Sequence, residues 1–247
     1  MDLRKSALFV ILAGIGLAAS LVFMQVMAGE AVTRPAEYPN RQGFAQAIFF
    51  FEMAQSPDEI RQVLGEPSAV NGIHIRKVMD AVNTYDYIFM LFYPMLFAAL
   101  FIFLRSLIRF KGHDVKYLRE MVYAGIALAA IMVLSDMFEN TLLFKISAYQ
   151  SISGISRDLI NTLQVATRIK SGAISLAGLI LSFLYASYFG KSWKLLLPAL
   201  YCIASAAGFI AISVSSARYI LETSATAGGI LWLVSAIHGG YWYFKSR

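Results

Sequence analysis

Two carboxylates and an amide lie close together in an otherwise apolar stretch: Asp136, Glu139 and Asn140. Spacings of three and four residues bring side chains to one face of a helix, so these three project together. Charges within a membrane-spanning helix cost about 2.5–3.5 kcal/mol each near its centre, and they face the helix bundle or a wet cavity. The spacing therefore predicts a sheltered acidic site.

Other polar residues are expected at the same level of the molecule. Asp136 lies about 24 Å along its helix from the basic segment that precedes it, at a rise of 1.5 Å per residue. Asp86 opens the preceding apolar stretch, and further polar residues flank the later ones. We expect a polar pocket on the outer side of a bilayer, lined by these ligand-binding residues: Asp86, Tyr93, Asp136, Glu139, Asn140, Arg168, Arg218 and Glu222.

A purely structural interpretation of the same residues stays open. Asp136 or Glu139 can pair with Arg168, Lys170 or Arg218 simply to tie helices together, and Asn140 can form a hydrogen bond between helices. An acid at the start of a helix, such as Asp86, is favoured by the helix dipole without any further role.

Metal and cofactor chemistry is not indicated. His74, His113 and His238 are far apart in the sequence, and the two carboxylates with Asn140 do not define a ligand set for Mg²⁺ or Ca²⁺. No phosphate-binding glycine loop, serine-elbow motif or zinc-protease motif is present. We therefore expect neither a metal nor a cofactor.

The elements that must position these residues are helices in a membrane. Of 247 residues, 58% are hydrophobic and 15% are charged, whereas soluble domains have about 45–50% and 25%. The apolar residues form long blocks, and about 20 of them as a helix cross a hydrocarbon core of about 30 Å. The pattern predicts an all-α fold, a polytopic transmembrane helical bundle forming one membrane domain over 1–247, with six spans at about 7–27, 87–108, 121–144, 172–189, 195–215 and 219–244.

The first span has an alternative interpretation. Arg4, Lys5 and a small-residue site at Val26-x-Ala28 are also typical of a secretory signal. Its apolar run of about 20 residues is longer than the usual signal core of 7–15, which favours a helix that is retained.

The longest connection, over 29–85, is predicted to be an extracytoplasmic helical loop. Ser56, Pro57 and Glu59 form the start signal of a short helix that should stop near Gly65. The aromatic stretch over 44–51 is expected to lie on the membrane or to pack over the mouth of the bundle. A further helix should begin near Ile73 and run into the second span.

Charge placement predicts the orientation and the partners. Short, densely basic segments occur at both chain ends and after the second and fourth spans, so both termini are predicted to be cytoplasmic. The net charge of +6 arises from these segments rather than from one basic face, so nucleic acid is not an expected partner. Membrane lipids are expected, together with a membrane-protein partner or a second copy of the chain.

Several short motifs together resemble a loose group of uncharacterised bacterial multi-pass membrane proteins. The resemblance covers roughly the first three spans and implies a bacterial inner-membrane setting, without any established activity. It is carried by FEMA at 51–54, SPDE at 56–59, DYIF at 86–89, Tyr93 and the D-x-x-E-N motif at 136–140.

Three functions follow as hypotheses. The leading one is a non-enzymatic protein whose outer pocket binds a lipid headgroup or small amphiphile, for transport, sensing or envelope maintenance. The second is an intramembrane lipid-modifying enzyme, in which Asp136 and Glu139 act as a general acid/base pair. The third is an accessory subunit of a membrane complex.

Overall fold

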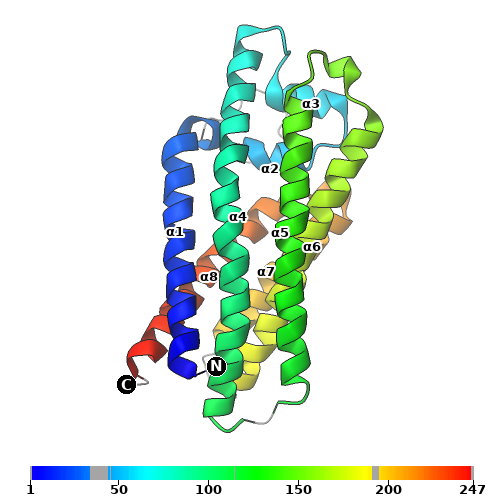
Figure 1. Ribbon diagram of the computed structural model, residues 1–247. Helices are drawn as coiled ribbons and strands as arrows, with labels where there is room; N and C mark the ends of the chain where they lie inside the picture. The colour runs from blue at the N-terminus through cyan, green and yellow to red at the C-terminus, as the bar shows by residue number, and fades with distance from the viewer. Residues whose placement is uncertain (1, 34–43, 45, 114, 191–194, 246–247) are drawn as a thin grey trace.

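The computed structural model describes residues 2–33, 44, 46–113, 115–190 and 195–245, and within these ranges every regular element is a helix. Six helices are long and apolar enough to cross a membrane, which confirms the predicted polytopic helical bundle. They are α1 (Leu3–Thr33), α4 (Val70–Phe110), α5 (Leu118–Ser147), α6 (Arg157–Phe189), α7 (Leu196–Ser213) and α8 (Ile220–Lys245) (Figure 1).

The six long helices pack as a closed ring. Each contacts the next along the chain, and α1 closes the ring by packing against both α4 and α8. An even number of crossings brings the two chain ends to the same end of the bundle, as Figure 1 shows. We call this the terminal end, and the opposite one the cap end.

α4 and α6 begin well before their predicted apolar spans. α4 begins at Val70, three residues before the predicted Ile73, and α6 begins at Arg157 rather than near 172. The extra turns of α6 are polar, so hydropathy does not detect them, but they form a regular helix whose first turn is capped by Ser156. As a result α4, α5 and α6 rise beyond α7 and α8 at the cap end (Figure 1).

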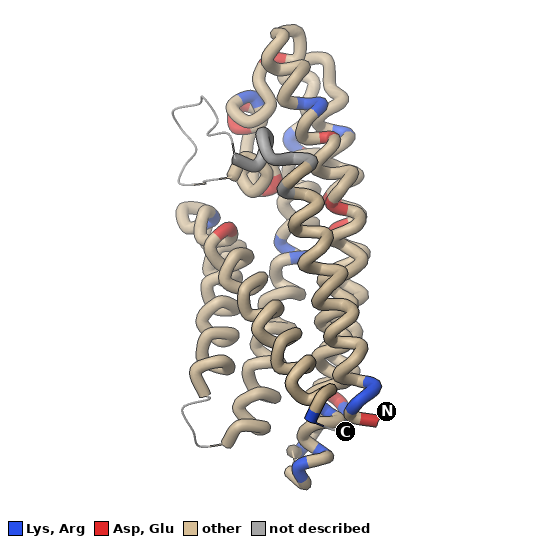
Figure 2. The backbone as a smooth tube through the Cα atoms, turned by 90° about the vertical axis from the view of Figure 1, so that its left-hand side faces the viewer, with Lys and Arg blue, Asp and Glu red and all other residues tan. Residues whose placement is uncertain are grey.

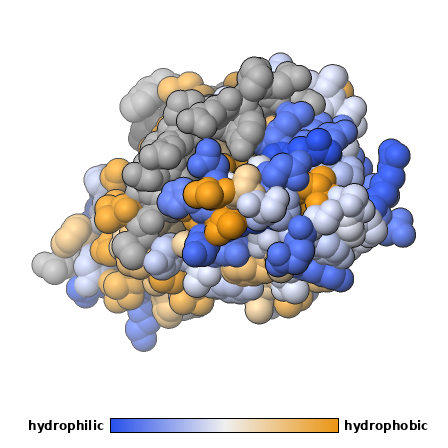
Figure 3. All heavy atoms as spheres, turned by 90° about the horizontal axis from the view of Figure 1, so that it is seen from above, coloured by the Kyte–Doolittle hydropathy of each residue, from blue (hydrophilic) through white to orange (hydrophobic). Residues whose placement is uncertain are grey.

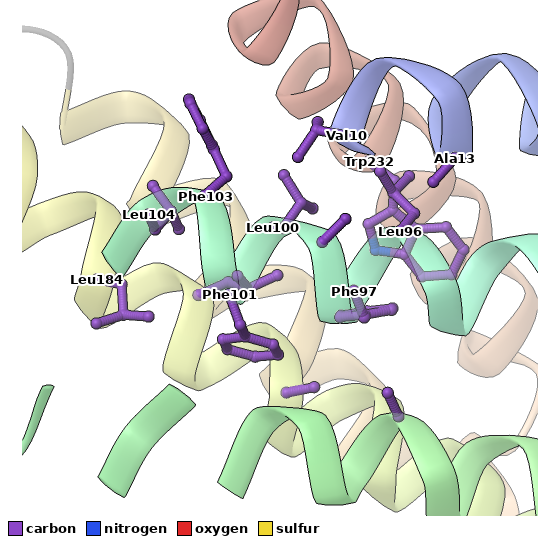
Figure 4. Close-up of a cluster of buried hydrophobic side chains, with 14 of the residues drawn as sticks. Val10, Ala13, Leu96, Phe97, Leu100, Phe101, Phe103, Leu104, Leu184 and Trp232 are labelled. Atoms are coloured by element: carbon purple, nitrogen blue, oxygen red, sulfur yellow. The ribbon is translucent and has the colours of Figure 1, made fainter. Parts of the chain in front are cut away.

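An apolar core fills the bundle from the terminal end to its middle. α4 supplies the largest share of it, and its Leu96, Phe97, Leu100 and Phe101 are almost completely buried. Figure 4 shows these side chains between α1, α6 and Trp232 of α8. This core holds the lower parts of α4, α5 and α6 in register, and those helices carry the polar residues above it.

Two short helices, α2 (Ala47–Glu52) and α3 (Pro57–Leu64), cover the cap end. We call residues 46–65 the cap. Ser56 accepts a hydrogen bond from the Glu59 N–H at 3.2 Å, and α3 stops at Gly65, whose φ of 68° suits glycine, so the predicted short helix is confirmed.

The cap packs onto the bundle through a second apolar core. Phe44, Phe50 and Phe51 are buried against the ends of α5 and α6, so the aromatic stretch covers the bundle mouth. Seen from above, the outer surface of this end combines hydrophilic residues with scattered apolar ones (Figure 3).

Candidate functional site

Polar side chains form a layer between the two apolar cores. Asp136, Glu139 and Asn140 lie between Met132 of the lower core and Leu142 of the upper core. Asp136 is about 27 Å along α5 from its first residue, and the hydrocarbon core of a bilayer is about 30 Å thick. The distance from the start of α5 to the polar layer is therefore close to that thickness. Figure 2 shows charged residues in the cap half and at the terminal end, with few between.

Lys170 of α6 is the cation at the centre of this layer. Its Nζ lies 3.2 Å from Asp136 Oδ1 and 3.5 Å from Glu52 Oε2, and it donates to Glu139 Oε2. The Thr167 hydroxyl, one turn earlier on the same face, donates to Glu139 Oε1 and also lies 3.1 Å from the Glu52 carbonyl oxygen. α6 thus connects α5 to the end of α2.

The seam between α4 and α5 supplies the rest of the layer. The Tyr93 hydroxyl donates to Asp136 Oδ2 at 2.9 Å. The Asn140 amide donates to Asp86 Oδ2 at 2.9 Å and lies 3.5 Å from the Asn83 carbonyl oxygen. These α4 residues are separated by three or seven positions, so they occupy one face of the helix.

We call the resulting group the Lys170 cluster: Glu52, Asp86, Tyr93, Asp136, Glu139, Asn140, Thr167 and Lys170. Its acids outnumber its cation by four to one. Asp136 and Glu139 are almost fully buried, while Asp86 is half-buried and the Glu52 and Lys170 side chains are 12% and 13% exposed. Burial raises the pKa of Glu52 well above its usual range; Lys170 opposes this shift and the neighbouring carboxylates add to it.

A second buried cation, Arg218, joins the cap to the start of α8. Its Nη1 and Nη2 donate to the two carboxylate oxygens of Glu59 at 2.7 and 2.6 Å, and Nη1 also donates to the Met53 carbonyl at 2.6 Å. Glu222 accepts from the Gln46 N–H at 3.2 Å. We call these residues the Arg218 cluster.

The structure brings together five of the eight predicted site residues. Arg168 lies outside this group: its side chain is exposed, because two residues along a helix rotate a side chain by about 200° from Lys170. Arg218 and Glu222 are also outside the Lys170 cluster. The cap lies between them and the acids of α5, and Glu59 and Gln46 engage them there.

Glu52, Thr167 and Lys170 belong to the cluster but were absent from the predicted pocket. Lys170 was foreseen only as one of three structural partners for the acids. Thr167 precedes it by three residues, and this spacing alone would have placed it on the same face. Glu52 has no such signal, because its position depends on how the cap folds back over the bundle.

The contacts within this layer are ion pairs and hydrogen bonds. Thr167, whose hydroxyl lies against Glu139, is 0% exposed. Within the described part of the chain, no three His, Cys, Asp or Glu residues are grouped so that they could hold a metal ion. An apolar groove of about 330 Å³ between α5 and α6 faces outward, since Leu134, Phe138 and Val165 on its walls are exposed.

Comparisons of the chain with protein-family models, with curated proteins and with solved structures found no match. The bundle and its polar layer are therefore the basis for a functional assignment.

Proposed function

We propose that this protein is a non-enzymatic multi-pass protein of the bacterial inner membrane that binds a lipid headgroup or small amphiphile at the Lys170 cluster, in transport, sensing or envelope maintenance. The observation that carries the proposal is the excess of carboxylates around one ammonium at the border of an apolar core. A cluster that served only to hold helices together would not need carboxylates in excess of cations, because each buried charge without a partner lowers the stability of the fold.

The exposed edge of the cluster supports this assignment. Asp86, Glu52 and Lys170 keep part of their surface accessible, while the deeper Asp136 and Glu139 are covered. A headgroup at the membrane border can meet these three side chains without unfolding the bundle. The cap lies over the same residues and contributes Glu52 itself.

Asp86→Asn tests the proposal. Within the described residues no cation lies within 4.0 Å of Asp86, so the amide leaves no buried cation unpaired. We expect wild-type protein extracted in mild detergent to retain an amphiphile in native mass spectrometry, and the variant to retain about tenfold less. Asp158→Asn, which alters an exposed acid in the first turn of α6, is the matched control and should behave as wild type.

An unchanged thermal midpoint in the Asp86→Asn protein would show that the loss concerns binding rather than folding. Equal retention by all three proteins, or no retained molecule in the wild type, contradicts the proposal.

The proposed orientation puts both termini in the cytoplasm and the cap outside, since the terminal end carries Arg4, Lys5 and Arg109 at its helix ends. A Cys202→Ala, Asp158→Cys variant should react with a membrane-impermeant maleimide added to spheroplasts. Labelling only after the membrane is opened would reverse the orientation.

A further inference from the structure

The charges of the Lys170 cluster are not balanced. Three carboxylates lie within 3.5 Å of the Lys170 ammonium, and Asp86 adds a fourth carboxylate beyond Asn140. Net negative charge at an apolar border is costly unless protons or another cation offset it. An anionic ligand would increase the net negative charge of the cluster, whereas a positively charged group would reduce it.

Asp86 is the carboxylate that such a group can reach. Its Oδ2 accepts one hydrogen bond, from the Asn140 amide at 2.9 Å, and no Lys, Arg or His of the described residues pairs with it. It is also half-buried, whereas Asp136 and Glu139 are covered. An ammonium that contacts Asp86 would therefore not compete with Lys170.

Beside Asp86 lies a second polar group that lacks a partner. Asn83 is 1% exposed, and its Nδ2 forms no hydrogen bond with any described residue. Asn83, Asp86 and Met90 follow one stripe of α4 that faces Asn140 of α5, which contacts all three. An amide N–H is a donor, so the missing partner is an acceptor oxygen.

We infer that the ligand is a zwitterion in which a protonated amine is joined by a short link to an oxyanion, as in a phosphoethanolamine headgroup; this rests on the proposed function. The amine donates to Asp86, and the oxyanion accepts from Asn83. Side chains three residues apart on a helix have Cβ atoms about 5–6 Å apart, which matches a two-carbon link between the two charges.

Lipid competition tests the amine. Full-length protein in detergent is equilibrated with equal amounts of dioleoylphosphatidylethanolamine, dioleoylphosphatidylglycerol and the N-acetylated form of the first lipid, and bound lipid is read by native mass spectrometry. We expect the free amine to be preferred about tenfold or more over both others. Asp86→Asn should bring this preference close to one, while Asp158→Asn leaves it intact.

The possible results separate this inference from the proposed function. Equal binding of all three lipids, or a preference that Asp86→Asn does not change, overturns the amine assignment, although amphiphile binding stands. Absence of any bound lipid overturns both.

Asn83→Leu tests the oxyanion independently. It removes the amide donor without changing charge, so it should weaken binding of phosphatidylethanolamine several-fold while the free amine stays preferred over the N-acetylated lipid. Unchanged binding would show that the oxyanion does not contact Asn83. Loss of the amine preference would show that the amine and the oxyanion are not bound by Asp86 and Asn83 as inferred.

Glycerophosphoethanolamine distinguishes the two sources of this chemistry, because it carries the same charges without acyl chains. Binding much weaker than that of the intact lipid supports a lipid as the ligand. Equal binding supports a soluble zwitterion, which keeps the amine assignment but removes the amphiphile from the proposed function.

Discussion

Arg218 and Lys170, two cations that contact the cap, have opposite surroundings. Arg218 meets Glu59 one to one, through two hydrogen bonds of 2.6 and 2.7 Å, and its guanidinium also lies 5.8 Å from the rings of Phe44 and Phe50. Lys170 meets three carboxylates at once, with a fourth nearby. Both join the cap to the bundle, but of the two only Lys170 lies within 4.0 Å of more than one carboxylate of the described residues.

This difference separates structure from function. A bidentate arginine–carboxylate pair matches one positive with one negative charge, so the Arg218–Glu59 pair needs no further ion. The Lys170 cluster is incomplete, because its acids need protons or a cation from elsewhere. We therefore expect substitutions in the Arg218 cluster to change stability, and substitutions in the Lys170 cluster to change binding and pH dependence.

The largest effect is expected for Arg218→Met. It leaves Glu59, 10% exposed, as a buried carboxylate without its cation, which costs about 3–5 kcal/mol of unfolding free energy. Thermal unfolding in detergent and limited proteolysis within the cap measure the loss. Arg61→Met is the control on the same cap, because its partners Asp58 and Glu66 are solvent-exposed and such pairs contribute about 0–1 kcal/mol.

A double variant sharpens this prediction. Arg218→Met with Glu59→Leu replaces the pair by apolar side chains and should recover most of the lost stability. A loss below that of Arg61→Met in the single variant would show that the cap is held by its aromatic core rather than by Arg218.

Substitutions of two neighbouring asparagines are expected to change the unfolding free energy by intermediate amounts and in opposite directions. Asn140→Leu removes the donor to Asp86 and should lower the unfolding free energy by about 1.5–3 kcal/mol, the range for hydrogen bonds to charged groups. Asn83→Leu removes an amide nitrogen without a described partner, so in lipid-free detergent it should raise stability by about 1–3 kcal/mol. Denaturant titrations of both variants measure the signs, and destabilisation by Asn83→Leu would mean that a buried water satisfies its amide.

The number of helices and the acidic face of α5 were predictable, because they depend on local properties. Hydropathy marks each span, and the spacing of Asp136, Glu139 and Asn140 assigns one face of one helix whatever its neighbours are. The signal at Ser56 for the start of α3 is equally local. The Glu59 carboxylate accepts from the Gln55 N–H at 2.7 Å and from Arg218, and the second contact depends on tertiary packing rather than on local sequence.

The pairing of helices was not predictable, because it depends on depth and rotation. Arg168, Lys170 and Arg218 were equivalent as partners for Asp136 when judged by sequence alone. The packing of α6 against α5 turns Lys170 inward and Arg168 outward. Arg218 pairs with Glu59 of the cap instead of with an acid of α5. Glu52 joins the cluster from a segment more than 80 residues before Asp136, where no spacing rule applies.

The smallest effect, and the one that tests the imbalance most directly, is expected for Glu52→Gln. Burial raises the pKa of Glu52 well above its ordinary value of 4.5, so the folded protein keeps this proton where the unfolded chain has released it. Stability should therefore fall as the pH rises from about 4.5 through the folded pKa. Glutamine carries no charge and removes this slope, so the variant should melt above wild type at pH 8 and close to it at pH 5. Glu66→Gln, whose side chain is 53% exposed, serves as the control and should keep the wild-type slope. A Glu52→Gln protein that melts below wild type at pH 8 would mean that the Glu52 carboxylate is ionised and paired with Lys170 in the folded protein.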